Sequence, residues 1–206
     1  FDFEWGEGAG VNQICRILSG EGIYAAPTLD FSPLVYTPIY YWFVSWFSGT
    51  CLQVTLVARL VSLLATIGAC GVIARLVITD TGNRIAGWLA GTLYLACFAL
   101  SDGFYDLVRV DSLYVLSLLA AFWTLRKSLK PAGFAAAGLA IAVGFYIKQS
   151  AIIVFLPLII YLVWREWKTA WPLLVSVILG ILIPFTGINR ATEGWFAYYM
   201  LRLPSE

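Results

Sequence analysis

The sequence contains no histidine, a single methionine and few charged residues. Without histidine, this chain cannot itself supply an imidazole for acid–base catalysis or for metal ligation. Charged residues make up 12% of its 206 positions and hydrophobic residues 61%, whereas a soluble domain carries about 25% charged and about 45–50% apolar residues. Because the chain lacks the polar surface of a soluble domain, its composition predicts an all-α integral membrane protein.

Two further classes of site find no support in the sequence. The net charge is +1 and no run of Lys or Arg occurs, so nothing indicates nucleic acid as a partner. The cysteines show neither CxxC nor any other metal-ligand spacing; they are Cys15, Cys51, Cys70 and Cys97. Cys70 and Cys97 lie in apolar stretches, where packed free thiols are expected.

Long apolar stretches alternate with short charged clusters after a polar N-terminal segment, which is the pattern that a bilayer requires. They predict a polytopic helix bundle with about six transmembrane helices, several of them at the short end of the usual ~17–25 residues. The fourth is rich in Ala and Gly and therefore suited to close packing. The candidate spans are 53–77, 85–101, 110–126, 132–147, 150–164 and 171–187.

Short helices are expected outside these spans. Residues 12–18 precede Gly20 and predict one of them. Residues 38–48 are apolar but too short to cross about 30 Å of hydrocarbon, and their Tyr and Trp side chains favour the headgroup layer. We therefore divide the chain into an outer loop with an interfacial helix (1–52), a transmembrane bundle (53–187) and an outer interfacial segment (188–206).

The charges of the connections predict an orientation. Basic residues dominate one set of connections, and the other set and the N-terminal segment are acidic. The positive-inside rule places the basic set in the cytoplasm. The basic set comprises Arg75, Arg84, Arg126, Lys127, Lys130, Arg165 and Lys168, and the acidic set comprises Asp102, Asp106, Asp111 and Glu193.

Three carboxylates occur within the first seven residues, at Asp2, Glu4 and Glu7. Carboxylates that lie close together raise one another's pKa, so one of them could serve as a general base or a metal ligand. The alternative is a solvated acidic loop without chemistry. Arg59 lies within the first span, where an unpaired charge is costly, and we expect it to face the interior of the bundle.

A second polar cluster lies around Arg109. If residues 105–114 are helical, Asp106 and Arg109 share a face, and Asp111 begins the next span, where its carboxylate can cap the helix. An ordered Arg at the membrane surface can also bind phosphate. An ion pair and a helix cap that merely hold the loop are the alternative.

Lys148 and Gln149 separate two apolar spans on the same outer side. Lys148 can be a snorkelling anchor, and the pair can equally contact a lipid headgroup.

Four stretches, in this order along the chain, resemble one family. They are residues 6–42, with GEG, ICRILSGEGIY and YTPIYYW; 105–113 (YDLVRVDSL); 145–150 (FYIKQS); and 193–198 (EGWFAY). They resemble GT-C membrane glycosyltransferases, and specifically a bacterial family-39-like branch related to protein O-mannosyltransferases and to the aminoarabinose transferase of lipid A.

The resemblance implies transfer of a sugar, with inversion, from a polyprenyl-phosphate carrier to a glycan, lipid or protein acceptor outside the cytoplasm, in the plasma membrane of a bacterium. A loop carboxylate then acts as the base. The family has an acidic pair before a Gly, whereas this chain has Gly6-Glu7. The implied base is therefore Glu7, with Glu4 or Asp2 as substitutes, or the protein has lost activity.

The resemblance also implies substrate-binding residues. Arg109 and Lys148 would bind the carrier phosphate, and Asp106 and Asp111 would orient substrate or bind metal. Gln149, Tyr36 and Tyr40 complete the expected set. A divalent cation, if one is used, would be held by Glu4, Glu7 or Asp106.

A transporter or lipid flippase without transferase chemistry is the main alternative. It would place ionisable groups near the bilayer midplane, and only Arg59 comes close to this position. A purely structural membrane protein is the third reading. We further expect this chain to be a fragment of a longer protein, with both ends missing. We do not expect the fragment to be active alone.

Overall fold

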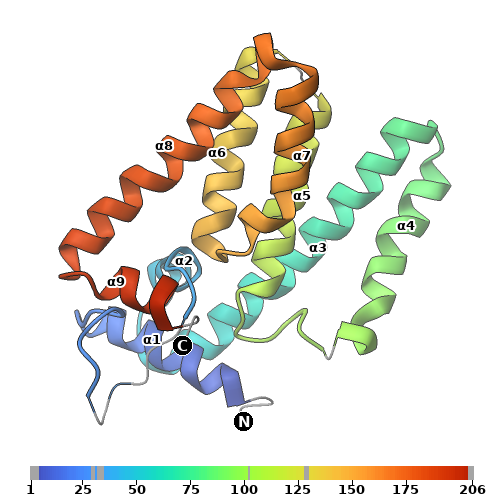
Figure 1. Cartoon of the computed structure of the whole chain (residues 1–206). Helices are drawn as coiled ribbons and strands as arrows, with labels where there is room; N and C mark the ends of the chain where they lie inside the picture. The colour runs from blue at the N-terminus through green and yellow to red at the C-terminus, as the bar shows by residue number, and fades with distance from the viewer. Residues whose placement is uncertain (1–4, 29–30, 32–34, 102, 128–129, 204–206) are drawn as a thin grey trace.

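The computed structural model describes the chain except for residues 1–4, 29–30, 32–34, 102, 128–129 and 204–206 (Figure 1). The regular elements of its described part are helices joined by turns and loops, with one isolated bridge between Thr28 and Phe31. The α-helices are α1 (Trp5–Leu18), α2 (Ile39–Phe47), α3 (Val54–Thr81), α4 (Arg84–Ala96), α5 (Asp111–Lys127), α6 (Pro131–Ile147), α7 (Ala151–Arg165), α8 (Trp167–Ala191) and α9 (Trp195–Ala197). The shorter turns are η1 (Cys51–Gln53), η2 (Cys97–Ser101) and the π-helical η3 (Tyr198–Arg202).

Helices α3 to α8 coincide with the six candidate spans and confirm the predicted helical membrane bundle. Among the described residues, three helical stretches are long and apolar enough to cross a membrane: Cys51–Thr81, Arg84–Ser101 and Trp167–Ala191. Helices α6 and α7 are apolar but shorter. Many large apolar side chains on α3, α4, α7 and α8 are exposed, as lipid-facing surfaces require.

The two predicted sets of connections lie at opposite ends of the bundle (Figure 1). The turns α3–α4, α5–α6 and α7–α8 form one end, which we call the basic end. Helices α1, α2 and α9 lie at the other end with the connections α4–α5 and α6–α7. We call this the acidic end.

Local sequence signals explain the sharp turn between α3 and α4. Gly82 ends α3 with a φ of 69°, a conformation that glycine adopts without strain. The Asn83 side chain then accepts hydrogen bonds from the backbone N–H groups of Ile85 and Ala86, and so caps α4.

A buried cluster holds the short helices of the acidic end against the bundle. It includes Ile14 of α1, Tyr40 and Val44 of α2, and Phe196 and Tyr199 near the C-terminus. A second cluster packs α5 to α8 together around Phe134, Ile141, Phe155 and Leu173.

The predictions for the short helices are confirmed in part. Helix α2 occupies the predicted stretch 38–48, with Tyr40 and Tyr41 buried and Trp46 and Phe47 exposed. The helix predicted over 12–18 ends where expected but begins at Trp5, because the first turns of α1 pack on the bundle instead of lying in a free loop.

Small residues allow α6 and α8 to approach closely, as predicted for the fourth span. A Cβ atom at Gly138 would lie 2.7 Å from both the Leu173 carbonyl oxygen and the Ser176 Cβ. We expect Gly138→Ala to destabilise the folded bundle by about 1–3 kcal/mol through overpacking, measured by reversible unfolding in detergent.

Gly187→Ala is the matched control on α8, because a Cβ there would meet no atom within 4 Å. In an open helical position, this change should be neutral or stabilising by up to about 1 kcal/mol. Equal effects of the two substitutions would show that close packing at Gly138 does not stabilise the bundle.

Candidate functional site: a cationic cluster at the acidic end

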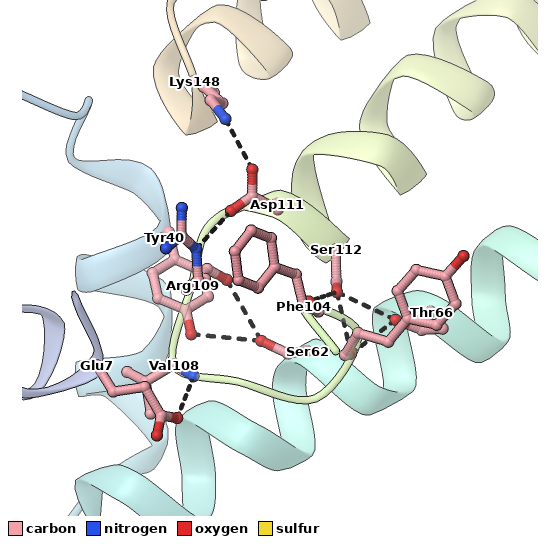
Figure 2. A network of polar contacts seen from close by, with 11 residues as sticks. Glu7, Tyr40, Ser62, Thr66, Phe104, Val108, Arg109, Asp111, Ser112 and Lys148 are labelled. Atoms are coloured by element: carbon pink, nitrogen blue, oxygen red, sulfur yellow. Dashed lines mark hydrogen bonds and ion pairs between the residues drawn. The ribbon is translucent and has the colours of Figure 1, made fainter. Parts of the chain in front are cut away.

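Two cations converge on one carboxylate where α5 begins (Figure 2). The Arg109 Nε donates to Asp111 Oδ2 at 3.0 Å, and the Lys148 Nζ donates to Asp111 Oδ1 at 2.7 Å. All three side chains keep between 21% and 25% exposure. Two positively charged side chains thus share one carboxylate, and guanidinium and ammonium groups are the usual donors to an anionic ligand.

Hydroxyl groups inside the bundle position the loop that carries Arg109. The Thr66 hydroxyl of α3 donates to the Tyr105 carbonyl oxygen at 2.8 Å, and Ser112 donates to the same oxygen at 3.0 Å. The Ser62 hydroxyl donates to the Arg109 carbonyl oxygen at 3.4 Å. These contacts satisfy backbone groups that a helix would otherwise pair internally.

The condition for Asp106 and Arg109 to share a helix face, that residues 105–114 are helical, is therefore not met. Residues 106–110 are an irregular loop, and α5 begins at Asp111 as predicted. Arg109 pairs with Asp111 and not with Asp106, and the Asp111 carboxylate contacts the two cations. Asp106 is half-buried and forms no hydrogen bond or ion pair with the residues described.

Lys148 lies in the tight turn between α6 and α7. Its Nζ is 5.7 Å from the ring centroid of Tyr36 and 5.6 Å from that of Tyr114, so aromatic faces flank the ammonium. The Gln149 amide donates to the Val35 carbonyl oxygen at 2.8 Å. The turn is thus joined to the segment before α2, which contains Tyr36.

A small cavity adjoins the cluster. It has a volume of about 110 Å³ and is lined by Gly6, Gly10, Tyr36, Tyr41, Val108, Arg109, Val110 and Asp111. This volume exceeds the ~10–15 Å³ that one water molecule requires. The structure therefore brings Tyr36, Arg109 and Asp111 to one cavity, with Lys148 bonded to Asp111.

Glu7 occupies a neighbouring but different environment. Its side chain has no solvent exposure, and its carboxylate forms a bidentate pair with Arg59, at 3.1 Å to Nε and 2.6 Å to the terminal nitrogen. The Val108 backbone N–H donates to Glu7 Oε1 at 2.8 Å. Both carboxylate oxygens are thus bonded, and Glu7 holds α1, α3 and the Arg109 loop together.

Among the remaining predicted residues, Tyr40 contacts a different part of the bundle. Tyr40 is buried, with its hydroxyl 3.4 Å from the Ser62 hydroxyl. Asp2 and Glu4 lie outside the described residues. Within the described part of the chain, no three His, Cys, Asp or Glu residues gather as metal ligands, and Glu7 is engaged by Arg59.

Two contacts were not predicted from the sequence. Cys15 of α1 and Cys51 of η1 form a disulfide, whereas Cys70 and Cys97 are free thiols, as expected. Arg59 faces inward as predicted, but its partner Glu7 lies 52 positions away. The only sequence signal for this pair was an arginine within a span, which requires a carboxylate nearby.

Between α1 and α2, the Tyr24 hydroxyl donates to the Tyr36 carbonyl oxygen at 2.8 Å. Burial raises the pKa of Tyr24, so this phenol stays neutral and remains a hydrogen-bond donor. It fixes the backbone of Tyr36 beside Lys148.

The fold defines a polytopic membrane protein, and two cations meet one carboxylate at one end of its helices. A sequence model of the dolichyl-phosphate-mannose-protein mannosyltransferase family matches residues 33–187, which is more than half of the chain. The chain belongs to this family of GT-C type. Membership implies a membrane glycosyltransferase that uses a polyprenyl-phosphate-linked sugar donor. No curated protein and no solved structure matches the chain.

Proposed function

We propose that the protein transfers a sugar, with inversion, from a polyprenyl-phosphate carrier to a hydroxyl group of an acceptor on the non-cytoplasmic side of a bacterial plasma membrane. One observation carries this proposal: the cations Arg109 and Lys148 converge on Asp111 at the acidic end. The donor is a phosphodiester with one negative charge, which these two cations would attract.

The two cations are also suited to the negative charge that develops on the phosphate during the reaction. As the acceptor oxygen bonds to the anomeric carbon, the bond from that carbon to the phosphate oxygen breaks, and its electron pair stays on the phosphate. The phosphate thereby gains negative charge while the acceptor hydroxyl loses its proton to a base. N–H donors of Arg109 and Lys148 that are already in place would stabilise this developing charge.

Two carboxylates are candidates for the base. Glu7 has the position that the resemblance implies, and it would have to exchange one of its present hydrogen bonds for the acceptor hydroxyl. Asp106 is half-buried in the loop that carries Arg109 and would not need such an exchange. We retain Glu7 as the proposed base and test it against Asp106.

Two features support placing the acidic end outside the cytoplasm. Basic residues gather at the opposite end, as the positive-inside rule requires of a cytoplasmic face. The Cys15–Cys51 disulfide lies at the acidic end, and disulfides persist in oxidising compartments such as the periplasm.

The flippase alternative predicted an ionisable group near the midplane. Arg59 is the fifth residue after the start of α3, about 8 Å along the helix, and it pairs with Glu7 at the acidic end. This position favours a site at the membrane surface over a conduit.

The test uses membranes that contain the full-length protein and a labelled polyprenyl-phosphate sugar. We expect the label to leave the carrier with wild-type protein. We expect Glu7→Gln to reduce this transfer by at least 100-fold and Asp106→Asn to reduce it less. Transfer at the wild-type rate by Glu7→Gln would refute the base assignment, and no consumption of any polyprenyl-linked donor would refute the transferase function.

A further inference from the structure

A groove opens at the basic end, opposite the proposed transferase site. It lies between α3, α4 and α5 and has a volume of about 460 Å³. The lining residues that matter here are Gly68, Gly71, Arg75, Trp88, Trp123 and Lys127.

The groove extends from the charged end into the apolar depth of the bundle. Gly68, Gly71 and Arg75 follow one another at spacings of three and four, so they share one face of α3. Helix α3 lines the groove from Gly68 to Ile78. This stretch of helix gives the groove a length of about 15 Å along α3. A Cβ atom at Gly71 would meet nothing within 4 Å, so this part of the groove is open.

Arg75 and Lys127 are the charged residues of the described lining, and both are exposed. Neither side chain forms an ion pair with any residue that the structure describes. Asp80, in the last turn of α3, pairs instead with Arg126. The mouth of the groove is therefore positively charged, and the neighbouring acid does not neutralise it.

Trp88 and Trp123 flank the same mouth, Trp88 one turn into α4 and Trp123 one turn before Lys127. Tryptophan is enriched at the depth where lipid headgroups meet acyl chains. Two cations, two interfacial aromatic residues and an apolar groove below them match the chemistry of a phospholipid: an anionic phosphate with an attached chain.

We propose that this groove binds one anionic phospholipid. Arg75 and Lys127 bind its phosphate, and one acyl chain lies along α3 over Gly71 and Gly68. Basic pockets between helices on the cytoplasmic side are known to select such headgroups. This site is separate from the cluster around Asp111 and does not depend on the transferase reaction.

The experiment uses purified full-length protein, with binding measured by native mass spectrometry and by thermal shift in detergent. Phosphatidylglycerol should bind at least tenfold more tightly than phosphatidylcholine with the same acyl chains. Arg75→Gln and Lys127→Gln should each remove most of this preference. Gly71→Leu should weaken the binding of both lipids, because it fills the groove and leaves the cations in place.

Lys168→Gln is the matched control, since Lys168 is an exposed cation at the basic end that does not line the groove. The proposal fails if Lys168→Gln weakens binding as much as Arg75→Gln, because the effect would then be general surface charge. It fails also if inorganic phosphate competes as well as the lipid, since a free anion would then be the ligand. The proposal fails, finally, if Gly71→Leu destabilises the protein without changing lipid binding. Another polypeptide segment would then fill the groove.

Discussion

Arg59→Met is expected to lower the free energy of unfolding by about 3–5 kcal/mol, because it leaves a buried carboxylate without its paired cation. Glu7 has no solvent exposure and bonds Arg59 through both oxygens. The loss should appear as a reduced midpoint when the full-length protein is unfolded in detergent by a denaturant and followed by circular dichroism.

The exposed pair at the basic end supplies the control. Arg126 and Asp80 keep 53% and 47% side-chain exposure, and exposed ion pairs contribute about 0–1 kcal/mol. Arg126→Met should therefore have a small effect. The double variant Glu7→Gln/Arg59→Met should be more stable than Arg59→Met alone, because no buried charge remains. Equal losses in Arg59→Met and Arg126→Met would contradict the structural role of the buried pair.

The structural contacts of Glu7 affect any activity assay of this residue. A residue that joins α1, α3 and the Arg109 loop can reduce activity by loosening the site as well as by losing a base. If Glu7→Gln abolishes transfer while the unfolding midpoint stays within the range of Arg126→Met, the carboxylate acts in the reaction. If transfer falls only in proportion to the folded fraction, its role is structural.

Lys148→Met is expected to reduce kcat/KM for the polyprenyl-phosphate donor by roughly ten- to 150-fold. A hydrogen bond to a charged group contributes about 1.5–3 kcal/mol, and each 1.36 kcal/mol corresponds to a factor of ten in rate. Kinetics with a labelled donor, at a fixed acceptor concentration, measure this effect.

Lys148→Arg should retain part of the activity, because it keeps the positive charge beside Asp111. Asp111→Asn should also reduce kcat/KM, since this carboxylate orients both cations. Unchanged donor kinetics in Lys148→Met would exclude Lys148 from phosphate binding and would move the proposed donor site elsewhere.

The apolar stretches were enough to predict helices α3 to α8 and the separation of charges between the two ends. They succeed because a bilayer imposes span length and loop charge on the local sequence. The convergence of Arg109, Asp111 and Lys148 was foreseen in outline, because all three adjoin span ends on the same side.

The sequence did not predict which side chains pair. The Glu7–Arg59 contact and the Cys15–Cys51 disulfide join residues far apart in the chain, and their formation depends on how α1 packs against α3. The irregular loop around Arg109 could not be derived from the sequence either, because its hydrogen-bond partners Thr66 and Ser62 belong to a different helix. Periodicity carries no information about such partners.

The disulfide also closes a covalent ring that contains α2 and Tyr36. Within this ring, the segment from Ser19 to Gly22 is exposed and polar, which is where a protease would cut first. A single cut there would leave both pieces attached through Cys15 and Cys51, with Glu7 on one piece and Tyr36 on the other. A nicked protein would thus separate into two bands on a denaturing gel only after reduction.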